Sequence, residues 1–289
     1  MRLPANLRDA LATHGFESHE DYGYALRCLF EQPGRQLRCL AIEGDCGRRK
    51  TAFANALSAA LAYPHSLYQD LAVPAGAAQR SGGDDSADAD ADIHAPSALD
   101  RLLSDACAYS EAEPTLCVLD QLQTLDFAEH IRLHRFVQSG EWHSANGEFI
   151  ANPRRLTLFL ISEEPLYHSL QKHSFRLWVR RAGYADHRYR AGEFALPDAA
   201  QQLIDALDPL FAALNVLPTH SEYARILDDI HARVGNADEL AQSIYGWTEG
   251  ISPQALHSAG CRHHLTTATA VIEDYLRADV VEMASPGAV

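Results

Sequence analysis

The chain has 289 residues, of which 47% are hydrophobic and 22% are charged, and its formal net charge is −15. This length predicts two units, and the excess of acidic over basic residues disfavours direct binding to a nucleic-acid phosphate backbone. The longest apolar runs are far shorter than a membrane span and the N-terminus has no apolar signal core, so we expect a cytoplasmic protein without membrane segments.

A predicted strand, a glycine-containing turn and a predicted helix follow one another early in the chain. Residues 36–44 form an apolar run that ends in glycine, as a buried strand does, and the alanine-rich residues 51–61 predict a helix. Residues 74–97 consist mostly of Pro, Gly, Ala, Ser and Asp, so we expect a disordered acidic insertion there. This insertion is either a tolerated surface loop or a docking segment for a partner.

Helices and strands alternate after this insertion. Residues 98–109 and 127–137 predict helices, whereas the apolar runs 115–120 and 156–162 predict buried parallel strands. Strands that alternate with helices in this way predict an α/β sheet.

The pattern changes after about residue 190. Leucines recur at helical spacing from Leu203 to Leu214, and a second apolar series runs from Tyr223 to Val234. The sequence therefore predicts an α/β nucleotide-binding domain over residues 1–192, followed by a helical lid domain over residues 193–289.

The turn after the first predicted strand matches most of a phosphate-binding loop. Gly44, Lys50 and Thr51 occupy the required positions, and Gly47 lies between them. Backbone N–H groups would surround the β-phosphate of ATP or ADP, Lys50 would reach the β and γ oxygens, and Thr51 would hold Mg²⁺. Arg49 stands where the pattern requires glycine, and its side chain opposes close approach of the backbone to phosphate. A chance match at the start of a helix is the alternative.

Asp120 ends the second buried strand, where a carboxylate would hold Mg²⁺ through water. The next residue should be a carboxylate that orients the attacking water, but it is Gln121, whose amide cannot accept a proton at neutral pH. The pair therefore predicts impaired hydrolysis, unless it is an ordinary strand end.

Four stretches of the chain together resemble the MoxR family of AAA+ ATPases. They are similar to its phosphate loop, the segment before its β-hairpin, its sensor-1 strand and the start of a lid helix, at residues 41–51, 133–141, 159–165 and 250–255. Their order and spacing agree with the family over most of residues 20–285. The resemblance implies a P-loop AAA+ domain with a parallel sheet flanked by helices, an all-α lid, and a β-hairpin between Glu141 and Asn152.

The chain departs from this family at positions that recognise phosphate. Glu164 stands at the sensor-1 asparagine and Gln254 at the sensor-2 arginine. A carboxylate at Glu164 would also repel the γ-phosphate of ATP. Ser174 occupies the place expected for the arginine finger, which leaves Arg176 either as a catalytic candidate or as a solvated surface residue.

A group of histidines and a cysteine follows the lid motif. His257, Cys261, His263 and His264 are residue types that bind zinc, and the first two lie one helical turn apart. No second pair of ligands at a characteristic spacing accompanies them, so we favour a structural helix over a metal site.

These features predict a degenerate AAA+ protein with weak or absent ATP hydrolysis, which serves as a scaffold or regulatory subunit in a protein-remodelling system. The alternative is an active MoxR-like ATPase, which Lys50, Thr51 and Asp120 would allow. A third interpretation uses Arg48, Arg49 and Lys50 as a plain anion site. The resemblance also implies a protein partner, such as a von Willebrand factor A domain protein, and self-association or ring assembly.

Overall fold

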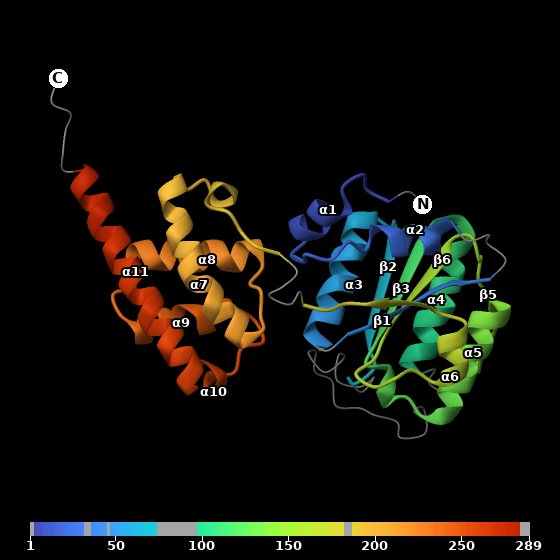
Figure 1. Cartoon of the computed structure of the whole chain (residues 1–289). Helices are drawn as coiled ribbons and strands as arrows, with labels where there is room; N and C mark the ends of the chain where they lie inside the picture. Colours follow the sequence, from blue (N-terminus) through green and yellow to red (C-terminus); the bar gives the residue numbers. More distant parts are fainter. Residues whose placement is uncertain (1–2, 32–35, 45–46, 74–96, 182–186, 284–289) are drawn as a thin grey trace, which may run out of the picture. The chain divides into compact units, whose positions relative to one another are not determined.

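The computed structural model describes residues 3–31, 36–44, 47–73, 97–181 and 187–283 (Figure 1). The chain divides into two compact units, the first made of residues 1–16 and 21–180 and the second of residues 17–20 and 181–289. The expected acidic insertion lies outside the described residues, apart from Ser97. In the described ranges, no helix is long and apolar enough to cross a membrane.

The first unit is a parallel sheet with helices on both faces. In chain order its elements are α1 (Leu7–Thr13), α2 (Gly23–Glu31), β1 (Arg38–Glu43), α3 (Gly47–Leu61), β2 (His65–Asp70), α4 (Ala98–Ala112), β3 (Thr115–Asp120), the short 3-10 helix η2 (Leu122–Thr124), α5 (Phe127–Ser139), β4 (Glu141–Ser144), β5 (Gly147–Ile150), β6 (Leu156–Ile161), α6 (His168–Lys172) and β7 (Phe175–Trp178). The sheet has the strand order β2, β3, β6, β1, β7, and all its neighbouring strands are parallel. The predicted α/β architecture is therefore confirmed.

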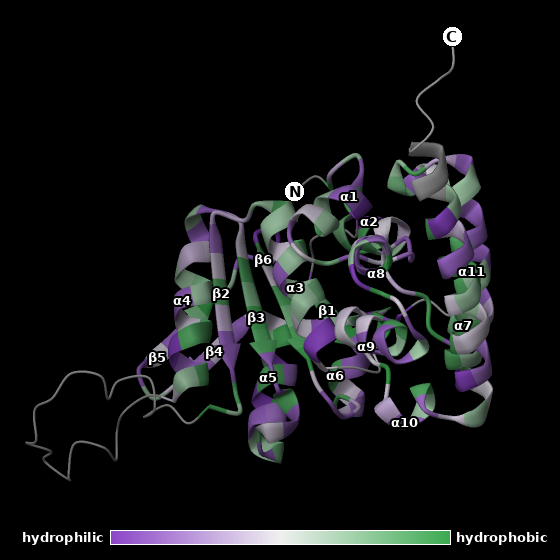
Figure 2. Cartoon of the chain, turned by 90° about the vertical axis from the view of Figure 1, so that its left-hand side faces the viewer, coloured by the Kyte–Doolittle hydropathy of each residue, from purple (hydrophilic) through white to green (hydrophobic). Residues whose placement is uncertain are grey.

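The central strands are mostly apolar because helices cover both faces of the sheet. Every residue of β3 and β6 is buried, and Figure 2 shows these strands mainly in the hydrophobic colour. Side chains alternate along each strand. Leu40 and Ile42 of β1 accordingly belong to the core with α1, α2 and α3, whereas Cys39 and Ala41 belong to the core with α4, α5 and α6.

Local capping sets the start of α4 and both ends of α5. The Ser97 hydroxyl accepts a hydrogen bond from the Asp100 N–H, and the Asp100 carboxylate accepts one in return from the Ser97 N–H. Asp126 caps α5 in a similar way, and Gly140 ends that helix with a φ of 77°. Such caps pair N–H groups and carbonyls that a helix end leaves without partners.

The antiparallel strands β4 and β5 form the hairpin that the family resemblance implied, which confirms that expectation. Trp142 of β4 is buried, and the Arg132 guanidinium lies 4.3 Å from its ring centroid. Arg132 also donates hydrogen bonds to the Asp100 carboxylate at 2.6 Å and to the His143 carbonyl at 2.7 Å. These contacts anchor the hairpin to α4 and α5.

The second unit is helical in its described residues, as predicted. Its elements are η4 (Ala191–Phe194), η5 (Asp198–Ala200), α7 (Gln201–Leu214), α8 (His220–Ala232), α9 (Ala237–Trp247), α10 (Pro253–Leu256) and α11 (Ala259–Met283). This unit has its own apolar core, in which the ring of Tyr189 packs 4.9 Å from that of Tyr223. The larger of the two segments of this unit begins at Arg181. The domain boundary at residue 193 stays a prediction.

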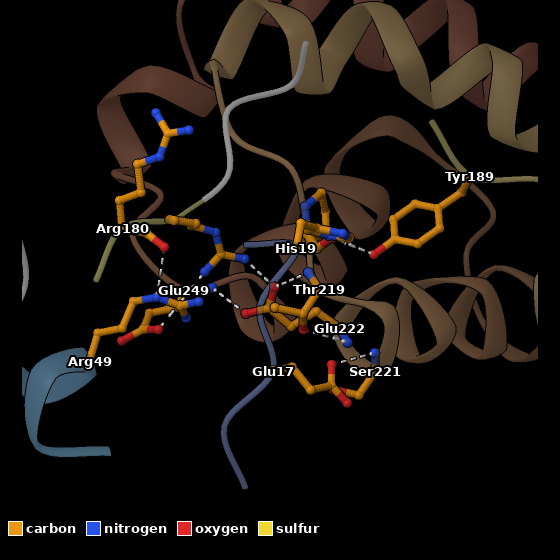
Figure 3. A network of polar contacts seen from close by, with 11 residues as sticks. Glu17, His19, Arg49, Arg180, Tyr189, Thr219, Ser221, Glu222 and Glu249 are labelled. Atoms are coloured by element: carbon orange, nitrogen blue, oxygen red, sulfur yellow. Dashed lines mark hydrogen bonds and ion pairs between the residues drawn. The ribbon is translucent and has the colours of Figure 1, made fainter. Parts of the chain in front are cut away.

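A short N-terminal segment, Glu17–Glu20, belongs to this helical unit. The Glu17 carboxylate accepts hydrogen bonds from the Ser221 N–H at 3.0 Å and from its hydroxyl at 2.9 Å (Figure 3). The His19 ring lies 3.0 Å from the Tyr189 hydroxyl, measured from its Nε2. Local sequence patterns did not indicate this association, which depends on contacts about 200 positions apart.

Candidate functional site

The glycine-containing turn lies between β1 and α3, at the carboxyl edge of the parallel sheet. A Cβ added to Gly44 would lie 2.1 Å from the backbone oxygen of Val179, so this position requires glycine. A Cβ added to Gly47 would lie 1.8 Å from a carboxylate oxygen of Glu163. In open α/β sheets, ligands bind outside the carboxyl ends of the strands, at the point where the strand order reverses. Gly44 and Gly47 thus lie at the edge of the sheet where a phosphate loop was expected.

Lys50 lies in the first turn of α3, and only 2% of its surface is exposed. Its Nζ donates a hydrogen bond of 2.6 Å to the backbone carbonyl of Ser162, which directly follows β6. Because β6 and β1 are adjacent strands, the loop after β6 comes to the phosphate loop. The ammonium group of Lys50 is thus bound by protein in this structure.

Thr51 and Asp120 come together as the sequence predicted. The Thr51 hydroxyl donates a hydrogen bond of 2.6 Å to Oδ2 of Asp120, and the Tyr68 hydroxyl donates one of 3.0 Å to the same oxygen. The Gln121 N–H donates to Oδ1 of Asp120 at 2.8 Å. Burial and the negative charge of Asp120 raise the pKa of Tyr68. A hydroxyl beside a carboxylate is the hard oxygen donor set that Mg²⁺ prefers, so these residues fit that ion.

Gln121 follows β3 in the left-handed conformation, with a φ of 61° and a ψ of 42°. Its side-chain oxygen accepts a hydrogen bond of 2.5 Å from the amide of Gln123. The side-chain oxygen of Gln123 in turn accepts from the Ser162 hydroxyl at 3.2 Å and from the Glu163 N–H at 3.1 Å. Neutral amide side chains are thus hydrogen-bonded to one another beside Asp120.

Arg49 replaces the glycine of the phosphate-loop pattern, and it lies inside α3 with a largely buried side chain. Its guanidinium lies 4.7 Å from the ring centroid of Phe16, and its Nε donates to the Arg180 carbonyl at 3.4 Å (Figure 3). The expected obstruction of the loop by the Arg49 side chain stays a prediction.

Arg176 lies on the edge strand β7, and it forms a bidentate ion pair with Glu43 at the end of β1. Its Nε and Nη2 donate to the Glu43 carboxylate at 2.8 and 2.6 Å. These hydrogen bonds and the charge of Glu43 raise the pKa of Arg176. Two parallel hydrogen bonds hold a guanidinium firmly to a carboxylate, so the charge of Arg176 is balanced within its own chain.

A cavity of about 190 Å³ opens beside the phosphate loop, with Lys50, Glu163, Glu164 and Arg176 among its lining residues. Among the described residues that line the cavity, three carry a carboxylate, namely Glu43, Glu163 and Glu164, and two carry a positive charge, namely Lys50 and Arg176. An excess of negative charge here opposes the entry of a polyphosphate.

Gln254 belongs to α10 of the helical unit, where it is exposed. Its role as a sensor-2 position stays a prediction. The neighbouring Pro253 and Leu256 line a cavity of about 400 Å³ in that unit.

The sequence pointed to a possible metal site between His257 and His264. Among the described residues, the side chains close enough to share a metal ion are those of Glu141, His143 and Glu148 on the hairpin. The segment from His257 to His264 does not form such a group.

The fold and the site define an α/β protein with a phosphate-loop-like turn and a separate helical unit. No protein-family model matches the sequence, and no curated protein matches it. Among solved structures, a point mutant of RuvB from Thermotoga maritima is 13% identical, with 78% of this chain and 67% of that chain covered at a TM-score of 0.39. NtrX from Brucella abortus, in complex with ATP, is 10% identical, with 96% of this chain and 55% of that chain covered at a TM-score of 0.40. This chain therefore spans about half the length of that NtrX chain.

Proposed function

We propose that this protein is a degenerate AAA+ protein of the MoxR type, which binds ATP or ADP with Mg²⁺ but hydrolyses ATP slowly or not at all. One observation carries the proposal. The Thr51 hydroxyl and the Asp120 carboxylate lie 2.6 Å apart, as a Mg²⁺–nucleotide site requires, whereas Gln121 stands beside them without a basic atom. The residues that would bind Mg²⁺ and nucleotide therefore lie together, whereas an amide stands where a base would activate water.

Different residues of the loop would bind the phosphates and the Mg²⁺ ion of the nucleotide. Backbone N–H groups at the start of α3 would hold the β-phosphate, because a helix N-terminus favours an anion. Lys50 would exchange the Ser162 carbonyl for phosphate oxygens. Thr51 and Asp120 would hold Mg²⁺, which neutralises part of the phosphate charge when bound. This exchange of partners at Lys50 supports a low nucleotide affinity.

Several positions that would accelerate hydrolysis are changed together. The side-chain oxygen of Gln121 already accepts a hydrogen bond from Gln123, and an amide cannot take a proton from water. Glu164 would place a negative charge in the cavity where the family has an amide. Arg176 would have to leave Glu43 before it could stabilise a transferring phosphoryl group. These changes favour a pseudoenzyme.

A protein that binds nucleotide without turnover suits the role of a scaffold or regulatory subunit in protein remodelling. The family resemblance supports cytoplasmic self-association or ring assembly and a protein partner of the von Willebrand factor A class. Light scattering after size-exclusion chromatography, with and without ADP and Mg²⁺, tests the assembly. A monomer under both conditions would count against it.

The intact contact between Thr51 and Asp120 also favours a second function, an active MoxR-like ATPase that remodels a partner. Measurements of ATP and ADP affinity together with turnover on the purified chain separate the two. We expect binding without turnover, and we expect Lys50→Ala to abolish the binding. Turnover near 1 s⁻¹, which lies in the usual range of enzymes, and its loss in Lys50→Ala would establish the active ATPase instead.

A further inference from the structure

The carboxyl group of Glu163 rests against the phosphate loop. The three heavy atoms nearest to a Cβ added at Gly47 all belong to this carboxyl group, and the closest is an oxygen at 1.8 Å. Gly47 is the first residue of α3, a helix of 15 residues. The first N–H groups of a helix have no partners within it and carry partial positive charge, so this end of α3 favours an anion. The Glu163 carboxylate thus lies beside an anion-binding position.

Hydrogen bonds at both polar groups of the peptide bond between Ser162 and Glu163 hold the backbone near the loop. The preceding carbonyl, that of Ser162, accepts the 2.6 Å hydrogen bond from Lys50. The N–H of Glu163 donates to the side-chain oxygen of Gln123 at 3.1 Å, and Gln123 in turn contacts Gln121. The segment after β6 therefore engages both the lysine and the first helical residue of the phosphate loop.

Space and charge beside the loop oppose a second anion while Glu163 stays in place. The cavity of about 190 Å³ is smaller than the roughly 300–1,000 Å³ usual for ligand pockets. A phosphate group at the start of α3 would lie within a few ångströms of the Glu163 carboxylate, where like charges repel each other. A bound polyphosphate therefore requires the Glu163 side chain to move away.

We propose that Glu163 determines the nucleotide affinity of this site, because its carboxylate occupies the anion position at the N-terminus of α3 as an internal substitute for phosphate. This inference rests on the proposed nucleotide binding. A nucleoside diphosphate or triphosphate with Mg²⁺ enters only by displacing the carboxylate and by freeing Lys50 from Ser162. The family resemblance drew attention to Glu164, whereas the contact with the loop is made by its neighbour.

The test compares the full-length protein with Glu163→Gln, which keeps the size of the side chain, and with Glu163→Ala, which removes it. Glu164→Gln is the matched control, because it makes the same charge change one residue away in the same cavity. Titration calorimetry with ADP and Mg²⁺ measures the dissociation constants. We expect both Glu163 variants to bind at least about tenfold more tightly than the unmodified protein, and Glu164→Gln to gain less than about threefold. Circular dichroism checks that each variant is folded.

The outcomes separate this inference from the proposed function. If the unmodified protein and both Glu163 variants bind ADP equally, Glu163 does not set the affinity, although nucleotide binding stands. An equal gain in Glu164→Gln would also overturn the inference, since net charge alone would then explain the effect. If no variant binds ADP, or if Lys50→Ala in the Glu163→Gln background leaves binding unchanged, the proposed site itself is wrong.

Discussion

Asp229 joins two helices of the second unit, and its charge should make the stability of that unit depend on pH. Its carboxylate on α8 accepts hydrogen bonds of 2.7 Å from the Ser243 hydroxyl and from the Trp247 indole N–H, both on α9. The Arg233 guanidinium donates to both carboxylate oxygens. These hydrogen bonds, with that of Arg233 foremost, lower the pKa of Asp229 from 3.8 to about 2.

The magnitude and the sign follow from this pKa. At about 1.4 kcal/mol per tenfold change in a protonation equilibrium, the lowered pKa corresponds to about 2 kcal/mol of folding stability. Because the folded-state pKa lies below the unfolded-state value, this contribution is complete well above pH 3.8. It is lost as the pH falls from 3.8 towards about 2.

The measurement is urea-induced unfolding, followed by circular dichroism from pH 7 to pH 2. Asp229→Asn keeps an acceptor oxygen but removes the charge, so we expect it to cost about 2 kcal/mol at neutral pH and progressively less below pH 4. Asp228→Asn is the matched control, since this neighbouring side chain is exposed, and it should change stability by less than about 0.5 kcal/mol. A cost at Asp229 that is the same at pH 7 and pH 2, or that equals the control, would refute the reasoning.

Three further predictions concern the first unit. The triple variant Arg49→Gly, Gln121→Glu and Glu164→Asn should hydrolyse ATP measurably in a phosphate-release assay while each single change does not, because these positions act as a unit; full activity in one single variant would contradict this. Ser97→Ala should lower the free energy of unfolding by about 1 kcal/mol through loss of the α4 cap, and an unchanged urea midpoint would count against it. Arg132→Ala should cost about 2 kcal/mol, and it should raise hydrogen exchange in the hairpin more than in the five-stranded sheet, since Arg132 packs on Trp142 of the hairpin; uniform exchange would argue against an anchoring role.

The parts of the fold that could be predicted from sequence are those whose burial is continuous. β3 and β6 are buried at every position, so most of their residues are apolar and form runs that a local pattern detects. β2 was missed because it is only partly buried and its sequence, His65–Asp70, is mostly polar. β7 was missed because four residues give too little pattern. These edge strands are stabilised by pairing with neighbouring strands that are distant in the sequence. A short sequence window does not contain both partners of such a pair.

In the candidate site, too, the residues of local motifs could be predicted, whereas residues that strand pairing brings to the site could not. Lys50, Thr51 and Asp120 belong to motifs with fixed spacing, and the contact between Thr51 and Asp120 joins two of those motifs. Tyr68 belongs to no motif, and Glu163 lies in the sensor-1-like stretch without a role assigned to it. Both reach the site only because β2 pairs with β3 and β6 pairs with β1. One signal for Glu163 was present, since it follows the end of a third buried strand, and such ends meet at one edge of a parallel sheet.

The membership of Glu17–Glu20 in the helical unit affects how the chain can be divided. The backbone passes from one unit to the other three times, after Phe16, after Glu20 and after Arg180. A protease that cuts once near residue 181 therefore leaves the halves joined through a tetrapeptide and its hydrogen bonds to Ser221. A recombinant C-terminal fragment would lack those four residues and expose the surface that they cover. The helical unit thus combines two distant segments of the sequence, and a ribosome must synthesise the second segment before Glu17–Glu20 can pack in the unit.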